Sequence, residues 1–176
     1  MSDRTHPAIL VMGVSGSGKT SVARALADRL GATFVEADEY HPPANVAMMA
    51  KGRPLTDAMR RPWLEALGDA VAEVRARGAV VFACSALKRT YRTILERRAG
   101  PVETVHLTAP RALIFARMAA RRDHFMPAAL LDSQIADLEP PGPEEAAIVL
   151  DVSAPVEALA RAAATEIARR HPELTT

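Results

Sequence analysis

The residues from Gly13 to Thr20 have the types and the spacing that bind a chain of phosphates. They match the pattern G-x-x-x-x-G-K-[ST]. Glycines let backbone amides approach a phosphate closely, and the positive end of the following helix adds to their field. The motif predicts a site for a nucleoside triphosphate, and the expected phosphate-binding residues are Gly13, Val14, Ser15, Gly16, Ser17, Gly18, Lys19 and Thr20.

Two side chains of this motif are expected to do chemistry. Lys19 is predicted to be catalytic, since its ammonium can contact the β- and γ-phosphates. The hydroxyl of Thr20 is predicted to be a ligand of Mg²⁺. The chance alternative, a loop merely rich in glycine and serine, is disfavoured because an apolar run precedes the motif and a helical pattern follows it.

A carboxylate follows the second predicted strand. Asp38 comes just after residues 33–36, and ligands of open parallel sheets bind beyond the carboxyl ends of the strands. We therefore expect Asp38 to face the γ-phosphate, where it accepts a proton from an attacking hydroxyl or holds a water on Mg²⁺. The alternative is a helix cap or a solvated turn. The nearby His41 and Asn45 suit structural roles as well as functional ones.

Cationic residues follow in later loops. Arg60 can offer a guanidinium fork to an anionic substrate, with surface charge as the alternative. Lys88 and Arg92 are four apart and are expected to share one face of a helix over residues 86–98. Two cations so placed repel each other unless an anion lies between them. This pair therefore favours the binding of a carboxylate or a phosphate.

An arginine-rich segment, about residues 117–137, is predicted to form a helical lid. Its arginines can neutralise charge on a transferring phosphoryl group, although a basic helix end would explain some of them. Gln134 would hydrogen-bond a polyol hydroxyl or simply be solvated.

Short apolar runs alternate with helical patterns and predict a single three-layer α/β domain, residues 1–176, around a parallel sheet. The runs are apolar almost throughout, as in strands that are buried on both faces. The expected strands are 9–12, 33–36, 80–84, 104–107 and 148–152. The expected helices are 22–30, 45–51, 62–77, 86–98, 111–122, 128–138 and 155–170.

Composition excludes several classes of protein. The net charge of +1 over 176 residues gives no field that would attract nucleic acid or an anionic membrane surface. No run of apolar residues is long enough to span a bilayer. The single cysteine, Cys84, excludes an internal disulfide and fits a reducing compartment. We therefore expect a cytoplasmic protein that binds neither nucleic acid nor membrane.

From Val11 to about Val156 the chain resembles the gluconokinases, P-loop kinases that use ATP and Mg²⁺ to phosphorylate D-gluconate to 6-phospho-D-gluconate. The resemblance implies a shikimate-kinase-like fold with a five-stranded sheet in the order 2-3-1-4-5, and a homodimer. It rests on the P-loop and on the strings around Asp38 with His41-Pro42 and Asn45, Pro54-Leu55 with Asp57, Arg60, Pro62-Trp63-Leu64, Cys84-Ser85-Ala86-Leu87-Lys88, Tyr91-Arg92, His124-Phe125-Met126-Pro127, Ser133-Gln134 and Leu138-Glu139.

The resemblance also implies roles for single residues. Asp38 would orient or deprotonate the C6 hydroxyl of gluconate. Arg117 and Pro155 would flank the adenine, and Arg121 would reach the phosphates as a catalytic residue. The candidate substrate-binding residues are Asp38, His41, Arg60, Lys88, Arg92, His124 and Gln134.

The sequence departs from the family pattern at three places. Ala37 replaces a frequent glycine before the aspartate, and Met48 replaces a frequent lysine. The acidic run before Arg60 is reduced to Asp57, which removes support for a second carboxylate in that loop.

Two other functions compete with this interpretation. A kinase of the same fold can act on shikimate, a nucleoside monophosphate or a different sugar acid, because a fold does not determine a substrate. A nucleotide-dependent switch is disfavoured, since the chain lacks an Asn-Lys-x-Asp guanine-binding motif.

Overall fold

Five parallel strands form the middle layer of the computed structural model, which describes residues 6–120 and 128–175. They lie in the order β2-β3-β1-β4-β5, which confirms the α/β fold class and the strand order implied by the family resemblance. Their bounds are β1 Ala8–Met12, β2 Thr33–Glu36, β3 Val80–Ala83, β4 Glu103–Thr108 and β5 Ile148–Asp151.

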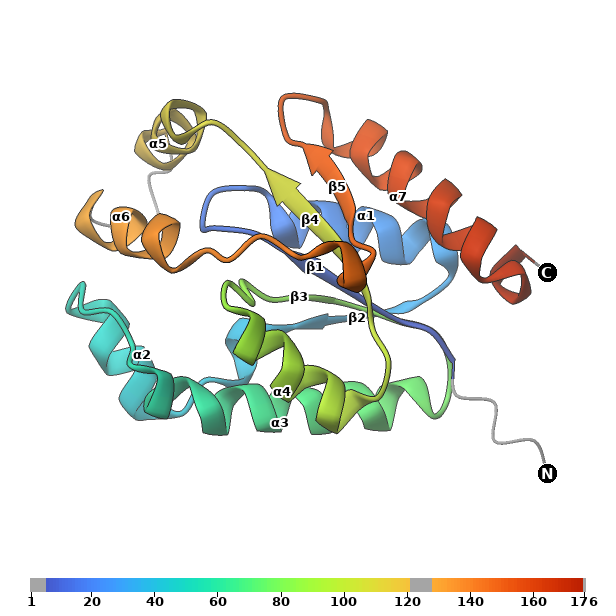
Figure 1. Cartoon of the computed structure of the whole chain (residues 1–176), viewed down its shortest axis with the longest axis horizontal. Helices are drawn as coiled ribbons and strands as arrows, with labels where there is room; N and C mark the ends of the chain where they lie inside the picture. The colour runs from blue at the N-terminus through green and yellow to red at the C-terminus, as the bar shows by residue number, and fades with distance from the viewer. Residues whose placement is uncertain (1–5, 121–127, 176) are drawn as a thin grey trace.

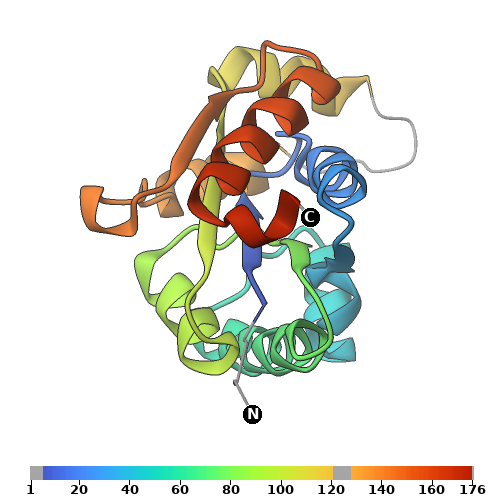
Figure 2. The same ribbon diagram turned by 90° about the vertical axis from the view of Figure 1, so that its right-hand side faces the viewer.

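Helices cover both faces of the sheet (Figure 1 and, turned by 90°, Figure 2). Side chains of β1 alternate between the two faces, as a strand requires. Leu10 and Met12 pack with residues of α3 and α4, whereas Ile9 and Val11 pack with residues of α1 and α7. The bounds of the helices are α1 Lys19–Leu30, α2 Pro43–Ala50, α3 Asp57–Arg75, α4 Arg89–Ala99, α5 Arg111–Ala119, α6 Ala128–Asp137 and α7 Val156–Arg170.

The carboxyl ends of the strands point to the left in Figure 1, where α2, α5 and α6 lie. A third apolar cluster lies at this end and contains Val14 of the loop after β1, Leu87 after β3, Ile114 of α5 and Leu131 of α6. It fixes α5 and α6 against the loops that follow the central strands. Short 3-10 helices complete the structure at Ala37–Tyr40 (η1), Pro143–Glu145 (η2) and Pro172–Thr175 (η3).

Three predicted helix starts were wrong by three residues or more. The helix α1 begins at Lys19 and not at residue 22, directly after Gly18, whose φ is +87°. The helix α3 begins at Asp57 and not at Pro62, because the side chain of Thr56 accepts a hydrogen bond from the Met59 amide and caps it. The helix α4 begins at Arg89 and not at residue 86, because Ala86 has φ of +45°. Lys88 is the extended cap residue and lies outside that helix.

Across residues 6–120 and 128–175, none of the helices combines the length and the apolar character needed to cross a membrane.

Candidate active site

The loop between β1 and α1 requires glycine at two positions. Gly13 and Gly16 have φ of +154° and +81°, values that residues with a side chain rarely adopt. A Cβ at Gly13 would lie 2.9 Å from the carbonyl oxygen of Leu107, and one at Gly16 would lie 2.9 Å from the side chain of Met118. Side chains are thus excluded at both positions, and the loop has the backbone form that phosphate binding needs.

The first turn of α1 carries the predicted catalytic lysine, Lys19, and the predicted magnesium ligand, Thr20. The Nζ atom of Lys19 lies 3.1 Å from the carbonyl oxygen of Val14, so the ammonium lies back over the loop. The Thr20 hydroxyl donates a hydrogen bond of 2.7 Å to Oε2 of Glu36. Glu36 is the last residue of β2, and this bond therefore joins the P-loop helix to the strand that leads to Asp38.

Asp38 lies in η1, directly after β2, and its side chain is exposed. Its backbone is held from the side by α3. The indole Nε1 of Trp63, whose side chain is buried, donates a hydrogen bond of 2.7 Å to the carbonyl oxygen of Ala37. Trp63 therefore fixes the peptide unit next to Asp38, which gives this tryptophan a positioning role.

The pKa of the Cys84 thiol, just after β3, depends on its burial and on the charges around it. Burial raises its pKa to about 12. The charge of Lys19 lowers this pKa, and the charges of Asp38 and Glu36 raise it further. The P-loop follows β1 and Asp38 follows β2, and the strands of the sheet run parallel. Asp38 and the P-loop lysine therefore lie at the same end of the sheet.

His41 follows η1 and stacks on Trp63, with ring centroids 4.0 Å apart and planes inclined by 16°. Burial lowers the pKa of His41, and the charge of Arg60 lowers it further, while Asp38 opposes the shift. Nδ2 of Asn45 lies 3.4 Å from Nδ1 of His41. The ring is therefore held neutral at the edge of the site.

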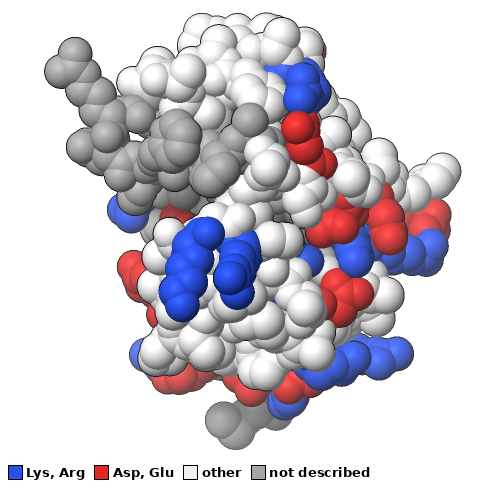
Figure 3. All heavy atoms as spheres, turned by 90° about the vertical axis from the view of Figure 1, so that its left-hand side faces the viewer, with Lys and Arg blue, Asp and Glu red and all other residues white. Residues whose placement is uncertain are grey.

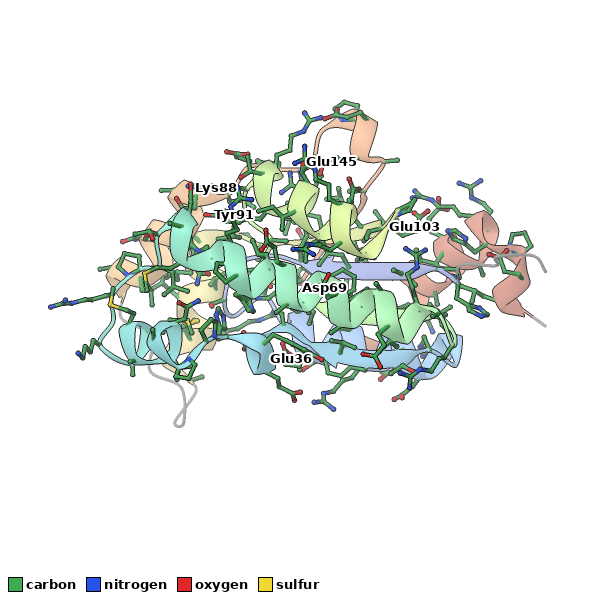
Figure 4. All side chains as sticks on the ribbon, turned by 90° about the horizontal axis from the view of Figure 1, so that it is seen from below. Glu36, Asp69, Lys88, Tyr91, Glu103 and Glu145 are labelled. Atoms are coloured by element: carbon green, nitrogen blue, oxygen red, sulfur yellow. The ribbon has the colours of Figure 1, made fainter. Side chains whose placement is uncertain are left out.

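A polar network joins the start of α3 to the start of α4 (Figure 4). Nη1 of Arg60 donates to the hydroxyl of Tyr91 at 2.7 Å, and that hydroxyl donates to Asp57. Nζ of Lys88 lies 3.0 Å from Oδ1 of Asp57, and this hydrogen bond raises the pKa of Lys88. The side chains of Arg60 and Lys88 are 13% and 26% exposed, so both cations are partly shielded from water.

A second carboxylate reaches the same cations from α6. Oδ2 of Asp137 lies 3.4 Å from Nη1 of Arg60, and Oδ1 lies 3.8 Å from Nζ of Lys88. Asp137 is the last residue of α6. The network therefore takes its members from three helices.

Arg92 does not form the predicted cation pair with Lys88. Its side chain is 4% exposed, and its Nε and Nη2 atoms contact the Glu145 carboxylate at 2.5 and 3.1 Å. Nη1 donates to the carbonyl oxygens of Ala86 and Leu87. Lys88 and Arg92 were expected to repel each other unless an anion lay between them. In the structure Lys88 pairs with Asp57 and Arg92 pairs with Glu145, so carboxylates of the protein offset both charges. Arg92 holds the loop before α4 and, with Glu145, has the contacts of a structural ion pair.

Gln134 of α6 lies against the P-loop. Its Oε1 accepts a hydrogen bond of 2.8 Å from the Ser15 amide, and its Nε2 lies 3.2 Å from the Ser15 hydroxyl. The alternative of a merely solvated side chain was wrong. Gln134 and Asp137 are three residues apart on the same helix, so α6 contacts the P-loop and the Arg60–Lys88 network together.

A cavity of about 280 Å³ opens beside the start of α1. Arg117 and Pro155, the residues expected to flank an adenine, both line it. Nη2 of Arg117 donates a hydrogen bond of 2.6 Å to the carbonyl oxygen of Val152, which holds the guanidinium at the wall. A Cβ at Gly18, which also lines the cavity, would meet nothing within 4 Å. The cavity is therefore continuous with open space at the P-loop.

Arg121 and His124 lie outside the described residues, and so does the central part of the predicted lid. Figure 3 shows the end of the molecule where the strands finish, with Lys and Arg side chains grouped near the middle of this face.

Sequence reasoning missed several residues of this site. Glu36 could have been identified from the sequence, since it ends the same strand that places Asp38. The hydrogen bond of Trp63 to the backbone beside Asp38 could not be inferred from residue spacing. The role of Asp137 could not be inferred either, because it meets Arg60 only through the packing of α6 against the rest of the domain.

Comparisons with known proteins identify the family of this chain. The family model described as an AAA domain matches residues 9–141. The chain is 51% identical over 141 residues to a protein named gluconokinase from Gluconobacter oxydans (strain 621H), with 80% of this chain and 79% of that protein covered.

Solved structures point the same way. A gluconokinase from Sinorhizobium meliloti 1021 has a TM-score of 0.86 and 42% identity, with coverage of 98% of this chain and 97% of that one. An unliganded sugar kinase from Janibacter sp. HTCC2649 has a TM-score of 0.89 and 45% identity, with coverage of 97% and 99%. On its P-loop, its sheet order and these relatives, the chain belongs to the gluconokinase family of P-loop kinases.

Proposed function

We propose that this chain is a gluconokinase, which transfers the γ-phosphoryl group of ATP to the C6 hydroxyl of D-gluconate. Membership of the family carries the reaction class, because relatives that cover most of the chain are named for it. The observation that supports the mechanism is the hydrogen bond from Thr20, next to Lys19, to Glu36 at the end of β2, two residues before Asp38. Shikimate and other sugar acids are not favoured as acceptors, because these relatives carry the gluconokinase name.

The nucleotide is proposed to lie between the P-loop and the start of α7. The bare backbone of the loop and Lys19 suit the phosphates, and the cavity lined by Arg117 and Pro155 suits the adenine. Arg121 is proposed to reach the phosphates, and residues 117–137 to act as a lid.

Magnesium is proposed to bind at the hydroxyl of Thr20. The adjacent Glu36 carboxylate offers an oxygen that can hold a coordinated water, and Mg²⁺ prefers oxygen ligands with several waters retained. When bound, the ion neutralises charge on the phosphates.

Asp38 is proposed to receive the proton of the C6 hydroxyl. As the C6 oxygen forms its bond to the γ-phosphorus, the bond from that phosphorus to the oxygen of ADP breaks and the proton passes to the carboxylate. The exposed position of Asp38 leaves room for an acceptor in front of it.

The acceptor's carboxylate is proposed to bind Arg60 and Lys88, whose partly buried charges already hold carboxylates of the protein. His41, which stacks on Trp63, and Gln134, which contacts the P-loop, are proposed to bind the acceptor as well, and His124 is proposed to join them from the segment outside the described residues. Arg92 is proposed to act indirectly, through the loop that carries Lys88.

The proposal includes a cytoplasmic location and a homodimer. The lone cysteine supports a reducing compartment, and the dimer rests on the family resemblance. Light scattering of the purified protein measures the oligomeric state directly.

The test of the mechanism is Asp38→Asn. We expect kcat with gluconate to fall by about 10²-fold or more, because a positioned base is lost, while calorimetry shows unchanged ATP binding. Glu39→Gln, which removes the adjacent exposed carboxylate of η1, is the matched control and should leave kcat within about twofold. Near-normal turnover of Asp38→Asn would remove this residue from the mechanism.

A further inference from the structure

The last turn of α6 places a carboxylate where it is unfavourable for the helix itself. Asp137 is the final residue of α6, and the carboxyl end of a helix carries partial negative charge. The α6 helix has no basic residue in its last turn to offset this charge. What compensates Asp137 comes from elsewhere, namely Arg60 of α3 and Lys88 before α4.

The two carboxylates of the network differ in which cation they approach. Asp57 lies 3.0 Å from Lys88 and 3.9 Å from Arg60, whereas Asp137 lies 3.4 Å from Arg60 and 3.8 Å from Lys88. Asp57 also accepts a hydrogen bond from Tyr91, and this bond together with the short contact to Lys88 holds it in place. Neither contact of Asp137 with the two cations is shorter than 3.4 Å, so Asp137 is the carboxylate that costs less to exchange, because ion pairs weaken with distance and need good geometry.

The rest of α6 is anchored independently of Asp137. Leu131 is 1% exposed in the apolar cluster with Val14 and Leu87, and Gln134 holds the Ser15 amide. Asp137 can therefore release the two cations by a change of its own side chain, without the loss of the packing that holds the helix.

We propose that Asp137 is a specificity-determining residue that competes with the acceptor's carboxylate for Arg60 and Lys88. When the acceptor binds, its carboxylate pairs with Arg60 and Lys88, and the side chain of Asp137 moves away from these two cations. This inference rests on the proposed function, since it takes Arg60 and Lys88 as the cations that read the acceptor.

The competition has a definite consequence for affinity. With Asp137 in place, an anionic acceptor must displace a carboxylate, and a second negative charge remains near its own. Asp137 thus lowers the affinity for any anionic acceptor, and only an acceptor with further good contacts binds well. Removal of the charge should improve gluconate binding, which is the opposite of what loss of an ordinary binding residue does.

The experiment is Asp137→Asn, measured by gluconate-dependent ADP formation and by calorimetric titration of gluconate. We expect the KM and the Kd for gluconate to fall by about threefold to tenfold, the scale of one partly screened ion pair, with kcat and the KM for ATP within about twofold. Asp137→Glu keeps the charge and should keep the KM at or above the value of the unchanged chain.

The matched control is Asp132→Asn. Asp132 lies on the same helix, but it is half exposed and pairs with Arg111, away from the network. The KM of Asp132→Asn for gluconate should stay within about twofold of the value of the unchanged chain.

A gluconate KM that is unchanged or raised in Asp137→Asn would overturn the inference, because Asp137 would then be neutral or a direct ligand of the sugar acid. Failure of the proposed function has a different signature, since the unchanged chain would then form no ADP in response to gluconate.

Discussion

The nucleotide side of the site is formed mainly by backbone, whereas the proposed acceptor side is formed by side chains. The nucleotide side is made from consecutive residues whose backbone does the work, with glycines at φ of +81° and +87° and one lysine that lies over the loop. The proposed acceptor side is made from side chains of η1, α3, α6 and the loop before α4, which are far apart in sequence. Its members hold one another through hydrogen bonds and ion pairs.

This difference explains how each side can vary. A backbone cradle binds any phosphate chain and tolerates few substitutions, because a Cβ at Gly13 or Gly16 would clash. A network of side chains can be changed one residue at a time, so the choice of acceptor lies there. The α6 helix contacts both sides, through Gln134 and Asp137.

The largest effect should come from the nucleotide side. Lys19→Met removes the charge that lies over the P-loop, and we expect kcat/KM for gluconate and ATP to fall by about 10³-fold, because charge on the transferring phosphoryl group loses its stabilisation. Steady-state ADP formation measures this loss. A decrease of less than about tenfold would contradict the role of the lysine.

A selective effect should come from the acceptor side. Arg60→Gln should raise the KM for gluconate by about tenfold to 100-fold, since a charge-assisted contact is lost, and should leave the KM for ATP within about twofold. Arg61→Gln is the matched control, because Arg61 is 64% exposed and only approaches Glu65 at 3.7 Å. Equal effects of the two variants would break the assignment of Arg60 to the acceptor.

The smallest effect concerns pH. Since burial lowers the pKa of His41, the unfolded chain binds more protons than the folded chain as pH falls below about 6.5. The stability that the neutral ring contributes is present above this pH and is lost as the pH falls further. Thermal unfolding should therefore show the advantage of the unchanged chain over His41→Phe shrinking from pH 7.5 to 5.5. A constant difference would contradict the lowered pKa.

The sequence predicted the nucleotide side far better than the acceptor side. The P-loop, the parallel sheet and the position of Asp38 after β2 follow from local pattern and from the geometry of parallel strands. The pairing of Lys88 and Arg92 was wrong, because Ala86 takes a left-handed conformation that puts Lys88 before the helix, and Glu145 takes up Arg92. Such contacts depend on packing between distant segments, which residue spacing does not encode.

Arg60 and Lys88 on the proposed acceptor side are expected to bind a carboxylate of the acceptor. The most direct test compares D-gluconate with D-sorbitol, in which an uncharged hydroxymethyl group replaces that carboxylate, by ATP-dependent ADP formation in the unchanged chain. We expect kcat/KM for gluconate to exceed that for sorbitol by about 10²-fold or more, because the neutral acceptor leaves both cations to the protein's own carboxylates. Similar values for the two acceptors would contradict the account.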